Sequence, residues 1–291
     1  MAEDAGSGAL VGAAAAFPRR LREAGVAKSG YVLGDFCIHP GYRSMGPALQ
    51  LQRACLEGIG GDSSALGYDF PSQHMLAVYR RLGIEPSDRL VRLAKPLRTI
   101  RKIAGAVRVP FVARGLSALG DPLLAWRDRE LERATGWDVA AQEKAGDEFT
   151  ALAQEVSAAH GVCVERSAEY LNWRFFAHPL RKHEMLTARR DGALRGYLLF
   201  TQQGEEAEIV DLFGVEDMTM WRGLVGRALR LLRARGVVTL SAPVLASHPR
   251  AEMLQSLGFR VRESLPVVMR VPGAGASPGG QWFLMDGDRD S

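Results

Sequence analysis

Residues 37–48 read CIHPGYRSMGPA, the apolar end of a predicted strand that passes through a tight turn into a predicted helix. Small residues stand at Gly46 and Ala48, where the backbone can approach a ligand closely. The first amides of a helix have no partner within the helix, and the helix dipole favours negative charge beside them. This stretch therefore predicts an anion site that could hold a diphosphate.

The pattern Arg43-x-x-Gly46-x-Ala48, led by Pro40-Gly41-Tyr42, resembles the coenzyme A loop of the GNAT N-acyltransferase superfamily. The resemblance covers residues 30–85 and implies acetyl-CoA, or a longer acyl-CoA, as co-substrate. It also implies that strand amides near Phe36 hold the pantetheine arm and polarise the thioester. Backbone amides from Ser44 to Leu49 would hold the diphosphate, although Pro47 has no amide hydrogen to donate. The predicted cofactor contacts are Cys37, Ile38, His39, Arg43, Ser44, Met45, Gly46, Pro47, Ala48 and Ser72.

Two residues are candidates for proton transfer. Tyr79 lies four positions before the glycine that ends its helix, where many GNAT enzymes place the tyrosine that protonates the departing thiolate. Asp35 is the leading candidate for the base, because it shares a strand face with Cys37, two positions on. His39, His74 and a water relay are the alternatives. Each candidate also has a structural interpretation: a carboxylate that accepts backbone hydrogen bonds, a surface or core histidine, or a packed aromatic ring.

An internal repeat indicates two related units. In the first half Asp35 opens the strand before the loop and Gly83, 48 positions on, ends the following helix; Asp211 and Gly258, 47 positions apart, do the same in the second half. The second unit lacks the glycine-containing loop. Its turn carries adjacent carboxylates at positions 216 and 217, which would repel a diphosphate, and leucine stands where the first unit has its tyrosine. The second unit is therefore predicted to be a degenerate copy that helps to shape the acceptor pocket.

The predicted fold class is α/β (α+β), with tandem GNAT-like mixed sheets flanked by helices. Its parts are an acyl-CoA-binding unit at 1–100, a mostly helical connector at 101–160, a degenerate unit at 161–272 and a flexible tail at 273–291. Strands are predicted at 9–17, 30–38, 184–190, 194–202 and 206–215, and helices at 47–58, 72–82 and 220–235. Only about eight residues precede the first predicted strand, so the strand and two helices that usually open a GNAT domain are expected to be missing.

Composition narrows the function further. A chain of 291 residues with 47% hydrophobic residues can bury a full core, and a net charge of +4 is too small to indicate nucleic-acid binding. The three cysteines have no metal-ligand spacing, which indicates a reducing, cytoplasmic location and no metal. No membrane segment is predicted. The acidic end at 286–290 lacks the distal glutamate of a calcium loop and is predicted to be frayed.

Two functions remain open from the sequence. The first is an N-acyltransferase that moves an acyl group directly from acyl-CoA to the primary amine of a small molecule or peptide in a ternary complex. The second is a noncatalytic tandem scaffold or binding partner in a biosynthetic pathway. The oligomeric state is open, a homodimer included.

Overall fold

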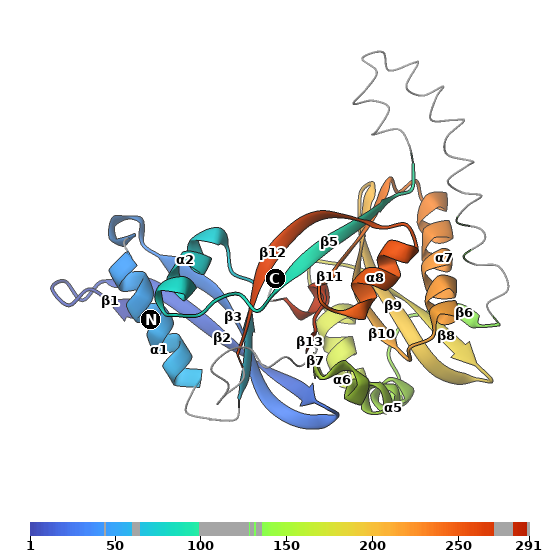
Figure 1. The fold of residues 1–291 in the computed structure, drawn as a ribbon, viewed down its shortest axis with the longest axis horizontal. Helices are drawn as coiled ribbons and strands as arrows, with labels where there is room; N and C mark the ends of the chain where they lie inside the picture. Colours follow the sequence, from blue (N-terminus) through green and yellow to red (C-terminus); the bar gives the residue numbers. More distant parts are fainter. Residues whose placement is uncertain are drawn as a thin grey trace, which may run out of the picture.

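The computed structural model describes residues 1–43, 45–59, 65–98, 136–270 and 282–289, together with positions 128 and 131. Two lobes lie side by side, bridged by long strands (Figure 1). The elements of the first lobe are β1 (Ala2–Glu3), β2 (Leu10–Glu23), β3 (Val26–Ile38), the 3-10 turn η1 (Pro40–Tyr42), α1 (Met45–Ile59), β4 (Leu66–Asp69), α2 (Gln73–Arg81) and β5 (Asp88–Pro96). The strands predicted at 9–17 and 30–38 and the helices predicted at 47–58 and 72–82 are confirmed.

The second lobe begins with a strand and a helix and ends with the segment that closes the chain. Its elements are β6 (Asp138–Gln142), α5 (Asp147–Val156), η2 (Ser157–His160), β7 (Val162–Val164), α6 (Ala168–Leu171), the π-helical η3 (Asn172–Phe176), β8 (His183–Arg190), β9 (Ala193–Gln203), β10 (Glu206–Gly214), α7 (Met218–Ala234), β11 (Thr239–Leu245), α8 (Pro249–Ser256), β12 (Arg260–Arg270), β13 (Trp282–Phe283) and η4 (Asp286–Asp288). The three strands predicted between residues 184 and 215 and the helix at 220–235 are confirmed.

The described strands form one mixed sheet in the order β13-β7-β2-β3-β4-β12-β5-β11-β10-β9-β8-β6, with β1 paired to β2 off this path. Strands of the two lobes are exchanged within this sheet. Strand β5 leaves the first lobe and pairs antiparallel with β11, and β12 returns to pair with β5 and then with β4. This exchange is the bridge seen in Figure 1. It makes one continuous sheet of the two lobes.

The two lobes run through the same order of elements. In the first, β3 and β4 are parallel with α1 between them, and α2 and β5 follow. In the second, β10 and β11 are parallel with α7 between them, and α8 and β12 follow. Both short helices end in a glycine of positive φ, 75° at Gly83 and 93° at Gly258, which is the usual stop signal of a helix.

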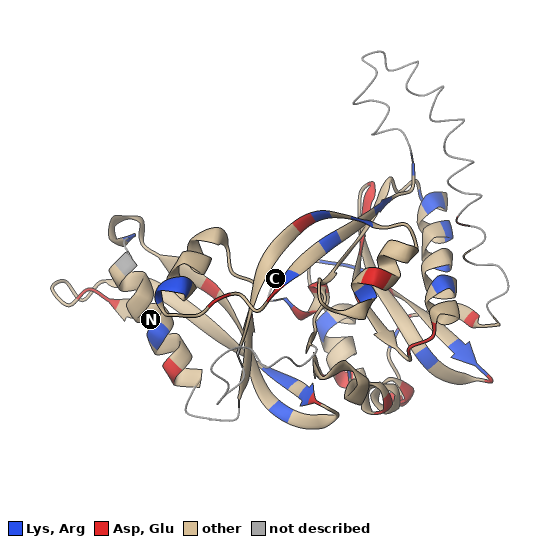
Figure 2. Ribbon diagram, in the orientation of Figure 1, with Lys and Arg blue, Asp and Glu red and all other residues tan. Residues whose placement is uncertain are grey.

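Helix α7 has one buried and one charged side, as its sequence pattern predicts. Leu224, Ala228 and Leu232 are fully buried against the sheet. The arginines follow the outer side of the helix (Figure 2), where Arg235 pairs with Glu184. The charge of this helix is therefore a solvated face over a packed core.

Among its described residues, the connector predicted at 101–160 to be mostly helical contains α5 and η2, and also strand β6, which pairs with β8 at the edge of the second lobe's sheet. The prediction about the end of the chain is wrong where the structure describes it. The flexible tail at 273–291 includes residues that are buried. Trp282 and Asp288 are each 2% exposed, because apolar side chains and an ion pair hold this segment between the lobes. The other residues of both predicted segments lie outside the described residues.

Across the described residues, none of the helices combines the length and the apolar character needed to cross a membrane.

Candidate active site

Strands β3 and β4 start as a parallel pair and then separate. Their pairing runs from Gly30 to Val32 on one strand and from Leu66 to Tyr68 on the other. Beyond Val32, among the described residues, β3 pairs with β2 alone. That edge of β3 therefore has no neighbouring strand in the described residues, which leaves room for an extended ligand.

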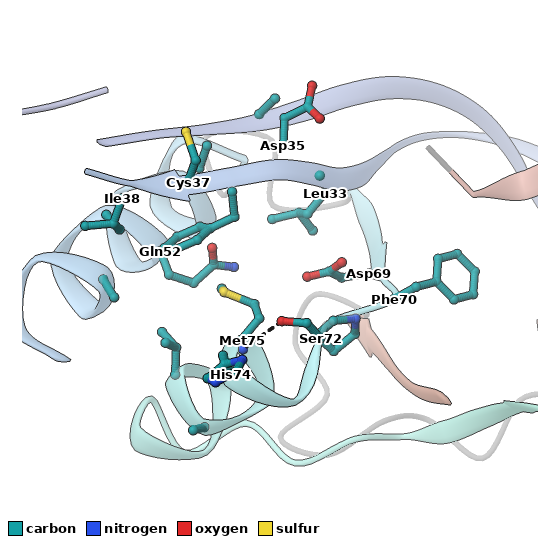
Figure 3. Close-up of a pocket in the computed structure, with 18 of the residues that line it drawn as sticks. Leu33, Asp35, Cys37, Ile38, Gln52, Asp69, Phe70, Ser72, His74 and Met75 are labelled. Atoms are coloured by element: carbon teal, nitrogen blue, oxygen red, sulfur yellow. Dashed lines mark hydrogen bonds between the residues drawn. The ribbon is translucent and has the colours of Figure 1, made fainter. Parts of the chain in front are cut away.

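A cleft of about 750 Å³ opens where the two strands separate. Strand β3 and the start of α1 form one wall, and the end of β4 and the start of α2 form the other (Figure 3). Ser72 caps α2, because its hydroxyl accepts a hydrogen bond from the Met75 amide at 3.2 Å. The helix start is thereby held at the rim of the cleft.

The structure brings half of the predicted site residues to this cleft. The residues that line it are Asp35, Cys37, Ile38, Arg43, Ala48 and Ser72, and the alternative base His74 lies there too. Ser44 is outside the described residues. Met45 begins α1, and Gly46 and Pro47 follow in its first turn without lining the cleft.

The first turn of α1 is open in front of the cleft. A Cβ atom added at Gly46 would meet no atom of the described residues within 4 Å. The side chain of Arg43 donates from Nε to the carbonyl oxygen of Ile38 at 3.2 Å, which keeps its guanidinium beside the helix start. His39 instead accepts a hydrogen bond from the Gly41 amide and lies away from the cleft. A helix start and a cation thus lie together at the cleft, which is the arrangement predicted for an anion site.

Asp35 lies at an irregularity in β3. Its φ is +49°, and the pairing with β2 shifts register opposite it, between Ala13 and Ala15. Aspartate is one of the few residues that tolerates this conformation. Figure 3 shows the carboxylates of Asp35 and Asp69 on opposite sides of β3, with the Cys37 side chain on the same side as Asp35. The predicted shared face is confirmed, and the carboxylate of Asp35 is presented on the side of the sheet away from α1 and α2.

The predicted acid Tyr79 is not at the surface of the cleft. Its side chain is fully buried, and its hydroxyl donates to Asp69 Oδ2 at 2.6 Å and accepts from Gln52 Nε2 at 2.9 Å. Burial and the nearby Asp69 carboxylate raise the pKa of Tyr79 well above its ordinary value. The group that faces the cleft is Asp69, and the role of Tyr79 as general acid stays a prediction.

Sequence reasoning missed Asp69, which ends the buried strand β4. Burial raises the pKa of Asp69 from 3.8 to about 6. The available signal was its position: an acidic residue that directly follows an apolar strand and precedes the Pro71-Ser72 turn into a helix. A buried carboxyl with a pKa near neutrality is typical of functional sites.

Replacing Asp69 with asparagine tests whether the pKa of Asp69 is raised, through the pH dependence of the free energy of unfolding. The pKa of Asp69 is higher in the folded than in the unfolded protein, so the wild-type protein loses stability as pH rises from 3.8 to about 6. The asparagine variant lacks this loss because its side chain does not titrate. Between pH 4 and pH 8 the stability of Asp69→Asn relative to wild type should rise by about 2–3 kcal/mol. Urea unfolding at a series of pH values measures this. A pH-independent difference would contradict it.

The comparisons with known proteins agree with this geometry. No protein-family model matches the sequence, and no curated protein is similar to it by sequence. Solved structures do match. A GCN5-related N-acetyltransferase from Anabaena variabilis superimposes on this chain with a TM-score of 0.62 at 14% identity. The match covers 90% of this chain and 60% of that one. The chain has a GNAT-type fold.

Two further GNAT-type structures support the same conclusion. A conserved protein from Enterococcus faecalis, described as a probable N-acyltransferase, matches with a TM-score of 0.61 at 16% identity, over 90% of this chain and 59% of that one. The N-myristoyltransferase of Saccharomyces cerevisiae, solved with myristoyl-CoA, matches with a TM-score of 0.56 at 13% identity. The match covers 93% of this chain and 70% of that one. The chain thus spans about 60% of the length of the first two structures.

In the second GNAT-type lobe the equivalent space is filled by the protein itself. Arg250, 1% exposed, donates to Glu216 Oε2 at 2.8 Å and to the carbonyl of Gly214, and its guanidinium lies 3.8 Å from the ring centroid of Trp221. Asp217 caps α7 with hydrogen bonds from two amides. The helix start that would face a diphosphate is therefore satisfied by the protein's own groups.

The gap between β10 and β11 is also closed. These strands pair only from Glu206 to Glu208 and from Thr239 to Ser241. Past that point the C-terminal segment lies between them, and Met285 forms an antiparallel bridge with Val244. In the second lobe the C-terminal segment thus occupies the place that the open cleft takes in the first.

Among the residues that the structure describes, no three or more His, Cys, Asp or Glu side chains are arranged to hold a metal ion.

Proposed function

We propose that this chain is an acyl-CoA-dependent N-acyltransferase whose donor site is the cleft of the first lobe. The observation that carries the proposal is the open separation of β3 and β4, which leads to a helix start flanked by Arg43. A diphosphate would bind at that helix start, and an extended arm would lie along the edge of β3 that has no neighbouring strand beyond Val32 in the described residues.

The reaction needs no covalent intermediate on the protein. The lone pair of the neutral amine attacks the thioester carbonyl carbon, forming the C–N bond and placing negative charge on the carbonyl oxygen. Free backbone amides of β3 stabilise that oxygen. The Asp35 carboxylate takes one proton from the nitrogen. The C–S bond then breaks, and the departing thiolate takes up a proton, so that the net change moves one proton from nitrogen to sulfur.

Asp35→Asn should lower kcat by about 100-fold or more, because a positioned general base contributes roughly that factor. Asparagine tolerates the positive φ at this position, so the fold should be kept. Asp191→Asn is the matched control, since Asp191 also has a positive φ, 53°, and lies outside the cleft. Steady-state kinetics and the acyl-CoA Kd measure the effect. An unchanged kcat in Asp35→Asn would rule out this base.

Release of free thiol from acetyl-CoA and longer acyl-CoAs, in the presence of amine panels, tests the function itself. Binding of each acyl-CoA is measured in parallel by the rise in melting temperature. Binding with amine-dependent thiol release is the expected result. No binding of any acyl-CoA would instead favour a noncatalytic scaffold.

A further inference from the structure

A second cleft of about 450 Å³ lies on the other side of Asp35, between the lobes. Phe17 and Asp35 line it from the first lobe, and Trp173, Arg174 and His178 line it from the second. Asp35 is the residue common to this cleft and the donor cleft. Its carboxylate points to the side of β3 away from Asp69 (Figure 3). A molecule in the second cleft would therefore meet that carboxylate first.

Two opposite charges face this space from different lobes. Within the described ranges, neither Asp35 nor Arg174 takes part in an ion pair with another residue. Arg174 donates from Nε to the Gly287 carbonyl at 3.0 Å and from Nη2 to the Arg289 carbonyl at 2.5 Å. Those bonds fix the guanidinium, and Nη1 donates to none of the described residues. It is therefore prepared to bind an anionic group without further ordering.

The remaining wall is aromatic. Trp173 is 58% exposed, an unusual exposure for a tryptophan, and it lies in the π-helical turn η3. Such turns are frequent at functional sites. His178 faces the same cleft, and its Nδ1 is already an acceptor for the Leu180 and Arg181 amides. Rings beside separated charges fit a small zwitterion with an apolar side group.

We infer that the second cleft binds the acyl acceptor and that this acceptor is an amino acid or a close analogue, with a primary amine, a carboxylate and an apolar or aromatic side group. The inference rests on the proposed function. The amine lies at Asp35, where it can reach the thioester between the separated strands. The carboxylate binds Arg174, and the side group packs on Trp173 and Phe17. The second lobe thus selects the acceptor, while the first lobe binds the donor.

The test compares amino acids with the amines that lack only the carboxylate: phenylalanine with phenethylamine, tryptophan with tryptamine and leucine with isoamylamine, each with acetyl-CoA. For the wild-type protein, kcat/KM should be at least ~10-fold higher for the amino acid than for its matched amine in at least one pair. One charge-assisted hydrogen bond to the carboxylate contributes a factor of that size. Arg174→Gln should bring that ratio close to one, mainly by raising KM for the amino acid. Arg181→Gln, on the same segment but outside this cleft, should leave the ratio unchanged.

Binding without turnover gives an independent readout. Calorimetric titration of the same amino acids into the protein saturated with coenzyme A should show binding that Arg174→Gln weakens at least ~10-fold. If acyl-CoA binds but no amino acid is bound or preferred over its amine, the inference is wrong and the donor site stands. If no acyl-CoA binds, the proposed function itself is wrong.

Discussion

Gly46→Glu should weaken acyl-CoA binding by at least ~100-fold, about 2.7 kcal/mol in binding free energy. The added carboxylate would occupy the first turn of α1, where the diphosphate is proposed to lie, and would repel it. The protein should tolerate the change, because a Cβ at Gly46 meets none of the described residues within 4 Å and a carboxylate in a first helical turn is favourable. Calorimetric titration with acetyl-CoA and with coenzyme A measures the loss.

Gly58 offers a matched control on the same helix. It is exposed near the other end of α1, and a Cβ there also meets none of the residues that the structure describes within 4 Å. Gly58→Glu changes the net charge by the same amount, yet it should leave acyl-CoA affinity within about twofold of wild type, since the site is at the helix start. Equal affinities for both variants and wild type would show that the donor does not bind at this turn.

Arg166→Met should lower the free energy of unfolding by about 3–5 kcal/mol. Arg166 is 2% exposed, and its guanidinium pairs with Asp211 at 3.0 Å and with Asp288 at 2.7 Å. Methionine keeps much of the volume but leaves two buried carboxylates without their cation. Tyr68 of the first lobe donates to the Asp288 carbonyl at 2.8 Å, so the loss should extend to the junction of the lobes.

Urea unfolding measures this effect, and Arg80→Met supplies the control. Arg80 and Glu85 form an ion pair of similar length, 3.2 Å, whose side chains are more than half exposed. Removing that pair should cost less than about 1 kcal/mol. A loss of the same small size in Arg166→Met would mean that the buried cluster contributes little to holding the C-terminal segment.

The local features of the proposed donor site could be predicted from the sequence. Glycine and proline near position 46, and the apolar run before them, specify a strand, a turn and a helix start, because these preferences act over a few residues. Asp35 could be placed on the face of Cys37 for the same reason. The position of Tyr79 on its helix was also predictable, but its burial behind Asp69 was not. That burial depends on Gln52 and Asp69, which come from two other elements.

The sequence by itself determined the alternation of strands and helices, the turn at which anion binding is predicted and the loss of that turn in the second unit. Only the tertiary structure decided that β5 and β12 exchange lobes, that residues 282–289 are buried, and that Asp35 faces Trp173 and Arg174 across a second cleft. Periodicity and turn chemistry are encoded within short stretches of chain. The choice of a strand's neighbour, or of an ion's partner, depends on which distant surfaces can be buried together.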